Sequence, residues 1–498
     1  MSDLRRRISE APTWLTLVAA GLVGAMTGLG QAPWGLWPLT LVGLCIVAMM
    51  LDATLRPRRA AWLGWAFGAG YFTLVLFWIT EPFYVDATRH AWMAPFALAT
   101  MAGGLALFWG LAFGVAKWLN RHSSLALIVT FTAAELLRAY VFTGFPWGMI
   151  AYVWVDTPFM QLAAHFGPHG LNALTLALTA GVYHLTLRKW RGVVIGLSAW
   201  GAAIGISLSG PSAPDTADGP TIRLIQPNAP QHLKWDPEWI PVWFDRQIGF
   251  TSAEGNPDLI VWPETSVPGV LDYNDDRIAQ ISQAANGTPV IFGTHRLSDA
   301  GYHNTLVAMD GSAEITGLYD KFHLVPFGEY VPGGDWIARI GLDMFSAQLG
   351  YGYASGEGPK LMDLGTLGLV QPLICYEAVF PQDVNQAPAG AEWMLQVTND
   401  AWFGTRSGPY QHLVQAQFRA VEQGLPMVRV ANTGVSAVID SKGRVIAQLP
   451  LNASGFLDET LPPAGRPTLY GRTGDLPVLL LVLALMAVLF ATRGRNNA

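Results

Sequence analysis

The stretch Leu373-Ile374-Cys375-Tyr376-Glu377 decides how the rest of the chain is interpreted, because an apolar run ends there in a nucleophile. Residues 367–374 are largely apolar and are bounded by glycines and by Pro381, a pattern that predicts a buried strand. A thiol at the carboxyl end of such a strand can face a cleft. Taken alone, however, a cysteine is more often a small buried apolar residue, so Cys375 needs support from other stretches.

Two other stretches supply that support. Residues 257–264 (PDLIVWPE) form a second apolar run that ends in a carboxylate, Glu264. Residues 319–329 (YDKFHLVPFGE) place the Lys321 ammonium on a loop that contains proline and glycine. A thiol needs a base to become a thiolate, and a cation to stabilise the thiolate and the later oxyanion. Glu264, Lys321 and Cys375 provide one group of each kind.

The composition indicates a membrane protein without a nucleic-acid-binding surface. Of 498 residues, 51% are hydrophobic and only 13% are charged, about half the charged share of a soluble protein. The net charge of -6 excludes a broad basic surface for nucleic acid. The two cysteines, Cys45 and Cys375, lie in unrelated contexts, which argues against a structural disulfide. Zinc-type Cys/His spacing and a P-loop are both missing, so the sequence implies no metal and no nucleotide cofactor.

Apolar runs on both flanks predict a polytopic α-helical membrane domain. The runs cover residues 14–29, 36–51, 61–80, 91–119, 125–142, 171–187, 193–208 and 476–492. Most approach the ~20 residues that a helix needs to cross ~30 Å of hydrocarbon, so we expect about eight spans. The first run follows Arg5–Arg7 and resembles a signal peptide, but further apolar runs follow it at once, which favours a retained span.

Basic residues predict the orientation of these spans. They gather in alternate loops and at both ends of the chain: Arg5–Arg7, Arg56, Arg58, Arg59, Lys117, Arg121, Arg188, Lys189, Arg191, Arg493 and Arg495. By the positive-inside rule these loops and both termini are cytoplasmic, which puts the polar region outside the cytoplasm. Residues 210–220 (GPSAPDTADGP) have the composition of a linker. We therefore divide the chain into a transmembrane domain (1–209), a catalytic domain (210–474), and a last helix with a cytoplasmic tail (475–498).

The polar region alternates between strand-like and helix-like patterns, which predicts an α/β sheet protein. Strands are expected at 221–226, 259–262, 289–294, 304–309, 367–375, 393–398, 427–431, 437–440 and 445–449. Helices are expected at 237–253, 275–285 and 410–423. Periodicity alone does not choose among α/β folds.

Four strings in order carry a family resemblance: VWPE (261–264), YDKFHLVPFGEYVP (319–332), CYE (375–377) and TNDAWFG (398–404). They resemble the carbon–nitrogen hydrolase (nitrilase) superfamily and, with the apolar flanks, its membrane-bound branch, the apolipoprotein N-acyltransferases. The match covers nearly the whole chain. It implies an αββα sandwich for the extracytoplasmic domain, and a location in the bacterial inner membrane with that domain facing the periplasm.

The resemblance also implies a reaction and its residues. An acyl chain passes from a membrane phospholipid, through a thioester on Cys375, to the α-amino group of the N-terminal diacylglyceryl-cysteine of a lipoprotein. Glu264 is the general base of this ping-pong acyltransferase, and Lys321 stabilises the thiolate and the tetrahedral intermediates.

Six further residues are expected to support the reaction. Glu329 and Glu377 orient the lysine and the substrate amine, or serve only as hydrogen-bond acceptors. The Tyr376 N–H is a candidate oxyanion donor. The substrate-binding candidates are Trp235, at the substrate entrance, and Trp402 and Phe403, which line an acyl pocket or belong to the core.

Three further interpretations depend on charge and apolar spacing. Glu135 and Arg138 lie one helical turn apart and predict a structural ion pair within the membrane. Arg419 and Glu422 predict another ion pair on a helix of the catalytic domain. Residues 333–352 carry an unusual apolar load between glycines and predict a mobile lid, the alternative being a segment packed on the core.

Two rival functions remain at this point. A membrane-tethered amidase that uses water as acceptor would need the same triad, but it would not need so many spans. A transporter or scaffold with an inactive enzyme domain would be favoured by a missing triad member, and all three are present.

Overall fold

The structure is a computed structural model that describes residues 10–120, 124–187, 190–208, 219–330, 332 and 352–496. The predicted lid falls almost entirely outside these residues. The chain forms two compact units: a helical unit of Met1–Ser212, Arg406–Val414 and Thr468–Ala498, and a sheet unit of Ala213–Thr405 and Gln415–Pro467.

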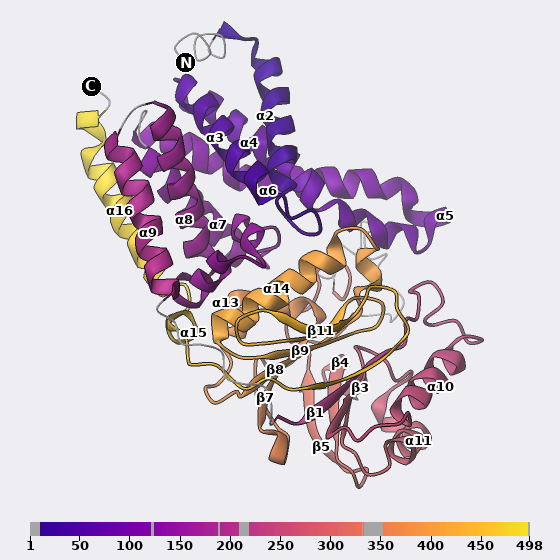
Figure 1. The fold of residues 1–498 in the computed structure, drawn as a ribbon. Helices are drawn as coiled ribbons and strands as arrows, with labels where there is room; N and C mark the ends of the chain where they lie inside the picture. The colour runs from indigo at the N-terminus through magenta and orange to yellow at the C-terminus, as the bar shows by residue number, and fades with distance from the viewer. Residues whose placement is uncertain are drawn as a thin grey trace. The chain divides into compact units, whose positions relative to one another are not determined.

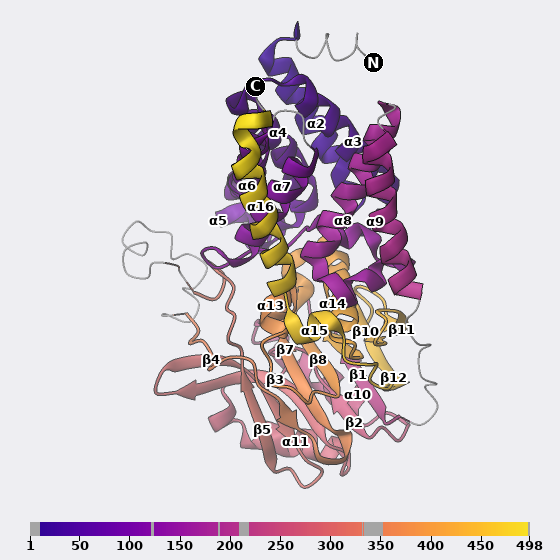
Figure 2. The ribbon, with the colours of Figure 1, turned by 90° about the vertical axis from the view of Figure 1, so that its left-hand side faces the viewer.

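The helical unit contains the N-terminal helices and the last two helices of the chain (Figures 1 and 2). The α-helices described there are α2 (Thr13–Gly28), α3 (Trp37–Ala53), α4 (Pro57–Val75), α5 (Ala87–His90), α6 (Ala94–Leu119), α7 (Ser124–Tyr140), α8 (Ala163–Thr186), α9 (Trp190–Leu208), α15 (Leu469–Thr473) and α16 (Leu476–Asn496). Short 3-10 helices lie between them at Phe77–Tyr84, Ala91–Met93, Ile150–Trp154 and Pro158–Leu162.

Glycines allow several of these helices to approach closely. A Cβ atom at Gly70 of α4 would lie 1.9 Å from the Gly21 carbonyl oxygen of α2. One at Gly64 would lie 2.6 Å from the Phe113 ring on α6. Small residues at such contacts let helix backbones pack without intervening side chains.

The predicted ion pair of α7 is present and buried. The Arg138 guanidinium donates to Glu135 at 2.7 Å, and both side chains are almost fully buried. Arg138 also donates to the Trp147 carbonyl oxygen at 2.8 Å, and Trp109 donates to Glu135 at 2.8 Å. These partners satisfy both charges inside the helical unit, as a buried pair requires.

The predicted count of about eight spans is not confirmed. Among the described residues, two helical stretches are long and apolar enough to cross a membrane, Ala87–Leu119 and Leu476–Arg493. A third is added if the bent pair Pro57–Val75 and Phe77–Tyr84, which meets at 48°, is one span. Thr13–Gly28, Trp37–Ala53 and Gly192–Ala202 are apolar but shorter. The bend after α4 therefore accounts for part of the difference. α8 is also kinked, at Gly167 beside Pro168, but this kink lies before the predicted run 171–187.

The sheet unit is built from two six-stranded sheets. The first has the order β12-β1-β2-β3-β4-β5 and the second the order β11-β10-β9-β8-β7-β6. The strands of the first are β1 (Thr221–Gln226), β2 (Leu259–Val261), β3 (Val290–Ser298), β4 (Gly301–Met309), β5 (Ile315–Asp320) and β12 (Gly455–Thr460). Those of the second are β6 (Met362–Asp363), β7 (Leu369–Ile374), β8 (Trp393–Thr398), β9 (Met427–Ala431), β10 (Ser436–Ile439) and β11 (Val445–Leu449). In each sheet three central strands are parallel, β1-β2-β3 and β7-β8-β9.

The two sheets share one core, and helices cover their outer faces (Figure 1). Leu224 and Leu306 of the first sheet join Leu395 and Val428 of the second in a single buried apolar cluster. A second cluster joins the outer face of the first sheet to α10 (Ile240–Thr251) and α11 (Asp275–Ala285). Short helix α13 (Pro381–Val384) and residues 415–423 of α14 (Gly408–Gln423) lie over the second sheet. The layers are therefore those of the predicted αββα sandwich.

Most predicted strands are present, and the missed ones lie at sheet edges. β1, β8, β9 and β11 have the predicted bounds, and β7 ends at Ile374, one residue earlier than expected. Strands β5, β6 and β12 were not predicted, and all three are edge strands. β12 is only half-buried along its length, so it lacks the continuous apolar run that marks a buried strand. The predicted Arg419–Glu422 ion pair is present on α14, at 2.7 Å.

Candidate active site

The loop after β2 carries Glu264 in a tight turn. Thr265 has a φ of 45°, in the left-handed region that side chains rarely adopt. Gly293 of β3 permits this turn, because a Cβ there would lie 2.5 Å from the Thr265 nitrogen and 2.8 Å from the Glu264 Cα. The Glu264 carboxylate accepts hydrogen bonds from Asn304 Nδ2 at 2.7 Å and from the Asn399 backbone N–H at 2.8 Å. These two hydrogen bonds fix the orientation of both carboxylate oxygens.

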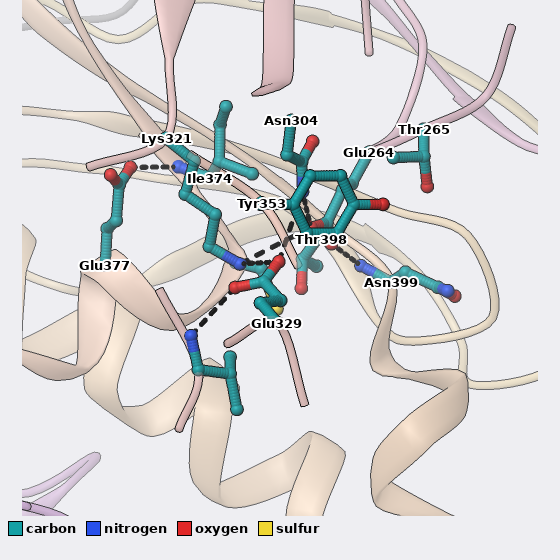
Figure 3. A network of polar contacts seen from close by, with 12 residues as sticks. Glu264, Thr265, Asn304, Lys321, Glu329, Tyr353, Ile374, Glu377, Thr398 and Asn399 are labelled. Carbon is teal, nitrogen blue, oxygen red and sulfur yellow. Dashed lines mark hydrogen bonds and ion pairs between the residues drawn. The ribbon is translucent and has the colours of Figure 1, made fainter. Parts of the chain in front are cut away.

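Lys321 follows the end of β5 and is buried between two carboxylates (Figure 3). Its Nζ lies 2.8 Å from Glu329 Oε1 and 3.7 Å from Glu264 Oε1. Glu329 is itself held by the Val325 N–H at 2.8 Å. Burial opposes the charge, but Glu329 and Glu264 hold the pKa of Lys321 above its ordinary value. The lysine is therefore a permanent cation in the site.

Cys375 lies where β7 gives way to a 3-10 helix, Cys375–Val379. Its φ of 50° is left-handed, and its carbonyl oxygen accepts a hydrogen bond from Gln396 Nε2 at 3.1 Å. Burial and the Glu264 charge raise the pKa of the thiol, against the Lys321 charge and a hydrogen bond with Thr398. Cys375 is therefore a thiol at rest, and a base must take its proton as the sulfur attacks.

Glu377 connects the strand that ends at Cys375 to the loop that carries Lys321. Its Oε2 accepts hydrogen bonds from the Ile374 N–H at 2.7 Å and the Tyr319 hydroxyl at 3.0 Å, and its Oε1 accepts from the Phe322 N–H at 2.8 Å. Burial raises the pKa of Glu377 to about 7, against these donors. Of the two expected roles, this geometry matches the hydrogen-bond acceptor. Tyr376 is also buried, with its ring edge-on to Phe380 at 4.8 Å.

The three predicted substrate-binding aromatics have different surroundings. Trp235 is 38% exposed and lines a pocket together with Glu264 and Thr265. Its ring centroid lies 5.9 Å from that of His295. Trp402 is also 38% exposed, whereas Phe403 packs against the core between the sheets. Neither Trp402 nor Phe403 lines the Trp235 pocket.

Three groups that contact the base were not expected from the sequence. Asn304 bridges Glu264 and Glu329, the latter at 3.4 Å. Asn399 contacts Glu264 through its backbone N–H. Lys234 is buried, and its Nζ donates to the Glu264 carbonyl oxygen at 3.2 Å. The position of Lys234 next to Trp235 in the sequence could have indicated that it lies near the site. The contacts of Asn304 and Asn399 with Glu264 depend on strand pairing, which the sequence does not reveal.

A metal centre is not evident in the part of the chain that the structure describes, since no three His, Cys, Asp or Glu side chains there are grouped to hold an ion. The Glu264 carboxylate contacts the Lys321 ammonium, the Asn304 side chain and the Asn399 backbone N–H. Such an arrangement suits proton transfer and covalent catalysis by side chains.

Comparison with known proteins identifies the family of the chain. Residues 23–182 match the apolipoprotein N-acyltransferase N-terminal domain, and residues 249–465 match the carbon-nitrogen hydrolase family. The chain is 36% identical to the apolipoprotein N-acyltransferase of Rhodopseudomonas palustris, over 99% of this chain and 98% of that protein. It is 37% identical to that of Caulobacter vibrioides, over 96% and 94%.

Solved structures of nitrilase-superfamily proteins resemble only part of the chain. An amidase from Nesterenkonia is 18% identical with a TM-score of 0.37, covering 51% of this chain and 94% of the amidase. That likeness is too distant to support an argument about function. The nearly full-length relatives are decisive, and the chain belongs to the apolipoprotein N-acyltransferase family.

Proposed function

We propose that this protein transfers an acyl chain from a membrane phospholipid to the α-amino group of a lipoprotein's N-terminal diacylglyceryl-cysteine. The observation that carries the proposal is the cluster formed by a base, a cation and a thiol in a chain of this family. Lys321 Nζ lies 3.7 Å from Glu264 Oε1, and the charges of both act on the Cys375 thiol.

The first half-reaction forms a thioester. Glu264 takes the proton of the Cys375 thiol as the sulfur attacks the ester carbonyl of the phospholipid. Lys321 and the Tyr376 N–H stabilise the oxyanion of the tetrahedral intermediate. When the ester C–O bond breaks, Glu264 returns the proton to the departing glyceryl oxygen, and a lysophospholipid leaves.

The second half-reaction consumes the thioester. The neutral α-amine of the lipoprotein attacks the thioester carbonyl, and Glu264 accepts a proton from the nitrogen. The C–S bond breaks, an amide forms, and the proton returns to Cys375. Glu329 holds Lys321 in place through both halves, and Trp235 lies where the acceptor or the acyl chain enters.

The membrane arrangement is part of the same proposal. We assign residues 1–209 to a transmembrane domain, 210–474 to the catalytic domain, and 475–498 to a last span and tail. All eight predicted apolar runs fall in helices, which supports about eight spans. The distribution of Arg and Lys supports cytoplasmic termini and a periplasmic catalytic domain in the inner membrane.

A labelled donor tests the reaction. Purified protein incubated with acyl-labelled phospholipid should accumulate a hydroxylamine-sensitive adduct, which a diacylglyceryl-cysteine peptide should discharge. Cys375→Ser should lose the adduct, since a hydroxyl beside the same base is a far weaker nucleophile. Cys45→Ser is the matched control and should keep it. Undiminished acyl transfer by Cys375→Ser would refute the nucleophile, and discharge to water at the same rate as to the peptide would favour the amidase.

A further inference from the structure

A second buried lysine, Lys234, lies against the main chain of the general base, whereas Asn304 contacts its carboxylate. Lys234 is 7% exposed and belongs to the loop that follows β1. Its Nζ donates to the Glu264 carbonyl oxygen at 3.2 Å and to Thr265 Oγ1 at 2.9 Å. The triad chemistry derived above does not use this ammonium.

These two hydrogen bonds stabilise the strained turn that carries Glu264. Residues with side chains rarely adopt the left-handed conformation of Thr265, and it persists only where the surroundings enforce it. On one side the turn is held by β3, where Gly293 allows the approach and its carbonyl oxygen accepts the Ser266 N–H at 2.8 Å. Lys234 adds two further contacts, to the main chain of Glu264 and the side chain of Thr265.

The Lys234 loop is itself anchored. Asn432 accepts the Ala229 N–H at 2.9 Å and donates to the Ala229 carbonyl oxygen at 2.8 Å. The Trp243 indole N–H donates to the Leu233 carbonyl oxygen at 3.2 Å. Lys234 is therefore presented to the turn by a loop fixed at both ends, which lowers the entropy lost in holding it there.

The charges around the site give Lys234 a second role. The carboxylates of Glu264 and Glu329 face a single triad cation, Lys321. Burial lowers the pKa of Lys234 to about 8, with Glu264 and Cys375 opposing the shift, so the amine remains mostly charged at neutral pH. The neighbouring His295 is neutral there, because burial and then Lys234 lower its pKa to about 4.

We propose that Lys234 is a positioning residue for the general base, because it fixes the turn that orients Glu264. Its ammonium also supplies a second positive charge beside the carboxylates of Glu264 and Glu329 when negative charge develops on Cys375. This inference rests on the proposed function for its acyl-transfer readout, but not for its effect on the thiol.

The test compares Lys234→Met with Lys234→Arg, and uses Lys360→Met as control, since Lys360 is exposed on the same unit. The first measurement is the pH profile of Cys375 alkylation by iodoacetamide, which needs no lipid. Lys234→Met should shift this profile to higher pH, because the thiolate loses a nearby cation. Lys234→Arg should restore most of it, and Lys360→Met should match the wild type.

The second measurement is acylation by phospholipid. Lys234→Met should lower kcat roughly 10- to 100-fold, since a base misplaced by about 1 Å can cost about 100-fold. KM for the donor should change little. Thr265→Val, which removes only the hydroxyl acceptor, should lower kcat to a smaller extent, and it serves as the test if Lys234→Met does not fold.

Unchanged alkylation profiles in Lys234→Met, or a fall in Tm without a shift in the profile, would overturn the inference. If Lys234→Met does not fold, an unchanged kcat in Thr265→Val overturns it. Failure of the proposed function would look different: Cys375→Ser would still transfer acyl chains, whatever the result with Lys234.

Discussion

Replacing Gln396 by methionine should separate the aim of the nucleophile from the stability of the sheet unit. Gln396 of β8 donates to the Cys375 carbonyl oxygen at 3.1 Å and accepts from the buried Arg429 guanidinium. Methionine keeps the length and volume of the side chain and removes both hydrogen bonds. The same change at Gln371 of β7 removes a hydrogen bond of 2.8 Å to the Val384 carbonyl oxygen, away from the nucleophile.

The magnitudes follow from the kind of hydrogen bond that is lost. A neutral hydrogen bond contributes about 1 kcal/mol and one to a charged group about 1.5–3 kcal/mol, so Gln396→Met should cost about 2.5–4 kcal/mol. For a unit of this size that lowers Tm by about 5–15 °C, against about 2–4 °C for Gln371→Met. Cys375 is held at a φ of 50°. If loss of the Gln396 hydrogen bond lets Cys375 relax and raises the activation free energy by about 1.4 kcal/mol, acylation slows about tenfold.

The assay pairs thermal unfolding in detergent with the rate of thioester formation from labelled phospholipid. Gln396→Met should lose both stability and rate, whereas Gln371→Met should lose stability alone. An acylation rate in Gln396→Met equal to that of Gln371→Met would refute the idea that Gln396 aims the nucleophile. A Tm equal to that of the wild type would refute the energetic reasoning.

Two other predictions concern topology and pH. A membrane-impermeant thiol reagent added outside spheroplasts should label Cys375 and leave Cys45 protected by lipid; labelling of Cys375 only after the membrane is breached would overturn the periplasmic assignment. Burial, and then Lys234, lower the pKa of His295 to about 4, below the ~6.5 of an unfolded chain, so its contribution to stability is present above about pH 6.5 and is lost as the pH falls toward 4. Between pH 7.5 and pH 5 the free energy of unfolding should fall by about 2 kcal/mol for this reason. His295→Gln should lack this fall. If the variant unfolds with the same pH dependence as the wild type, the linkage is disproved.

Much of the architecture could be predicted from the sequence, because central strands of the two sheets are buried on both faces. Strands such as β1, β8 and β9 are fully or almost fully buried, and their continuous apolar runs mark them without any knowledge of the partner strand. The apolar helices of the helical unit are visible from the length and composition of their apolar runs. The motif strings also placed Glu264 and Cys375 at strand ends and Lys321 on a loop, and the structure brings Lys321 to 3.7 Å from Glu264.

The edge strands could not be predicted in this way. β5 and β12 are half-exposed and carry polar residues, so they become strands only because β4 and β1 offer paired hydrogen bonds. The number of spans is a related case. Apolar length alone suggested straight crossings, whereas the structure bends by 48° between Pro57–Val75 and Phe77–Tyr84.

The surroundings of the base are a property of the tertiary structure alone. Glu264 receives its hydrogen bonds from Asn304, 40 positions away, and from Asn399, 135 positions away. Lys234 reaches the same turn from 30 positions before it. Hydrophobic periodicity records which face of a strand is buried, but a hydrogen-bond partner is chosen by the register between strands from two sheets. For that reason the sequence determined which residues could perform the chemistry, and only the folded sheets decided which groups aim them.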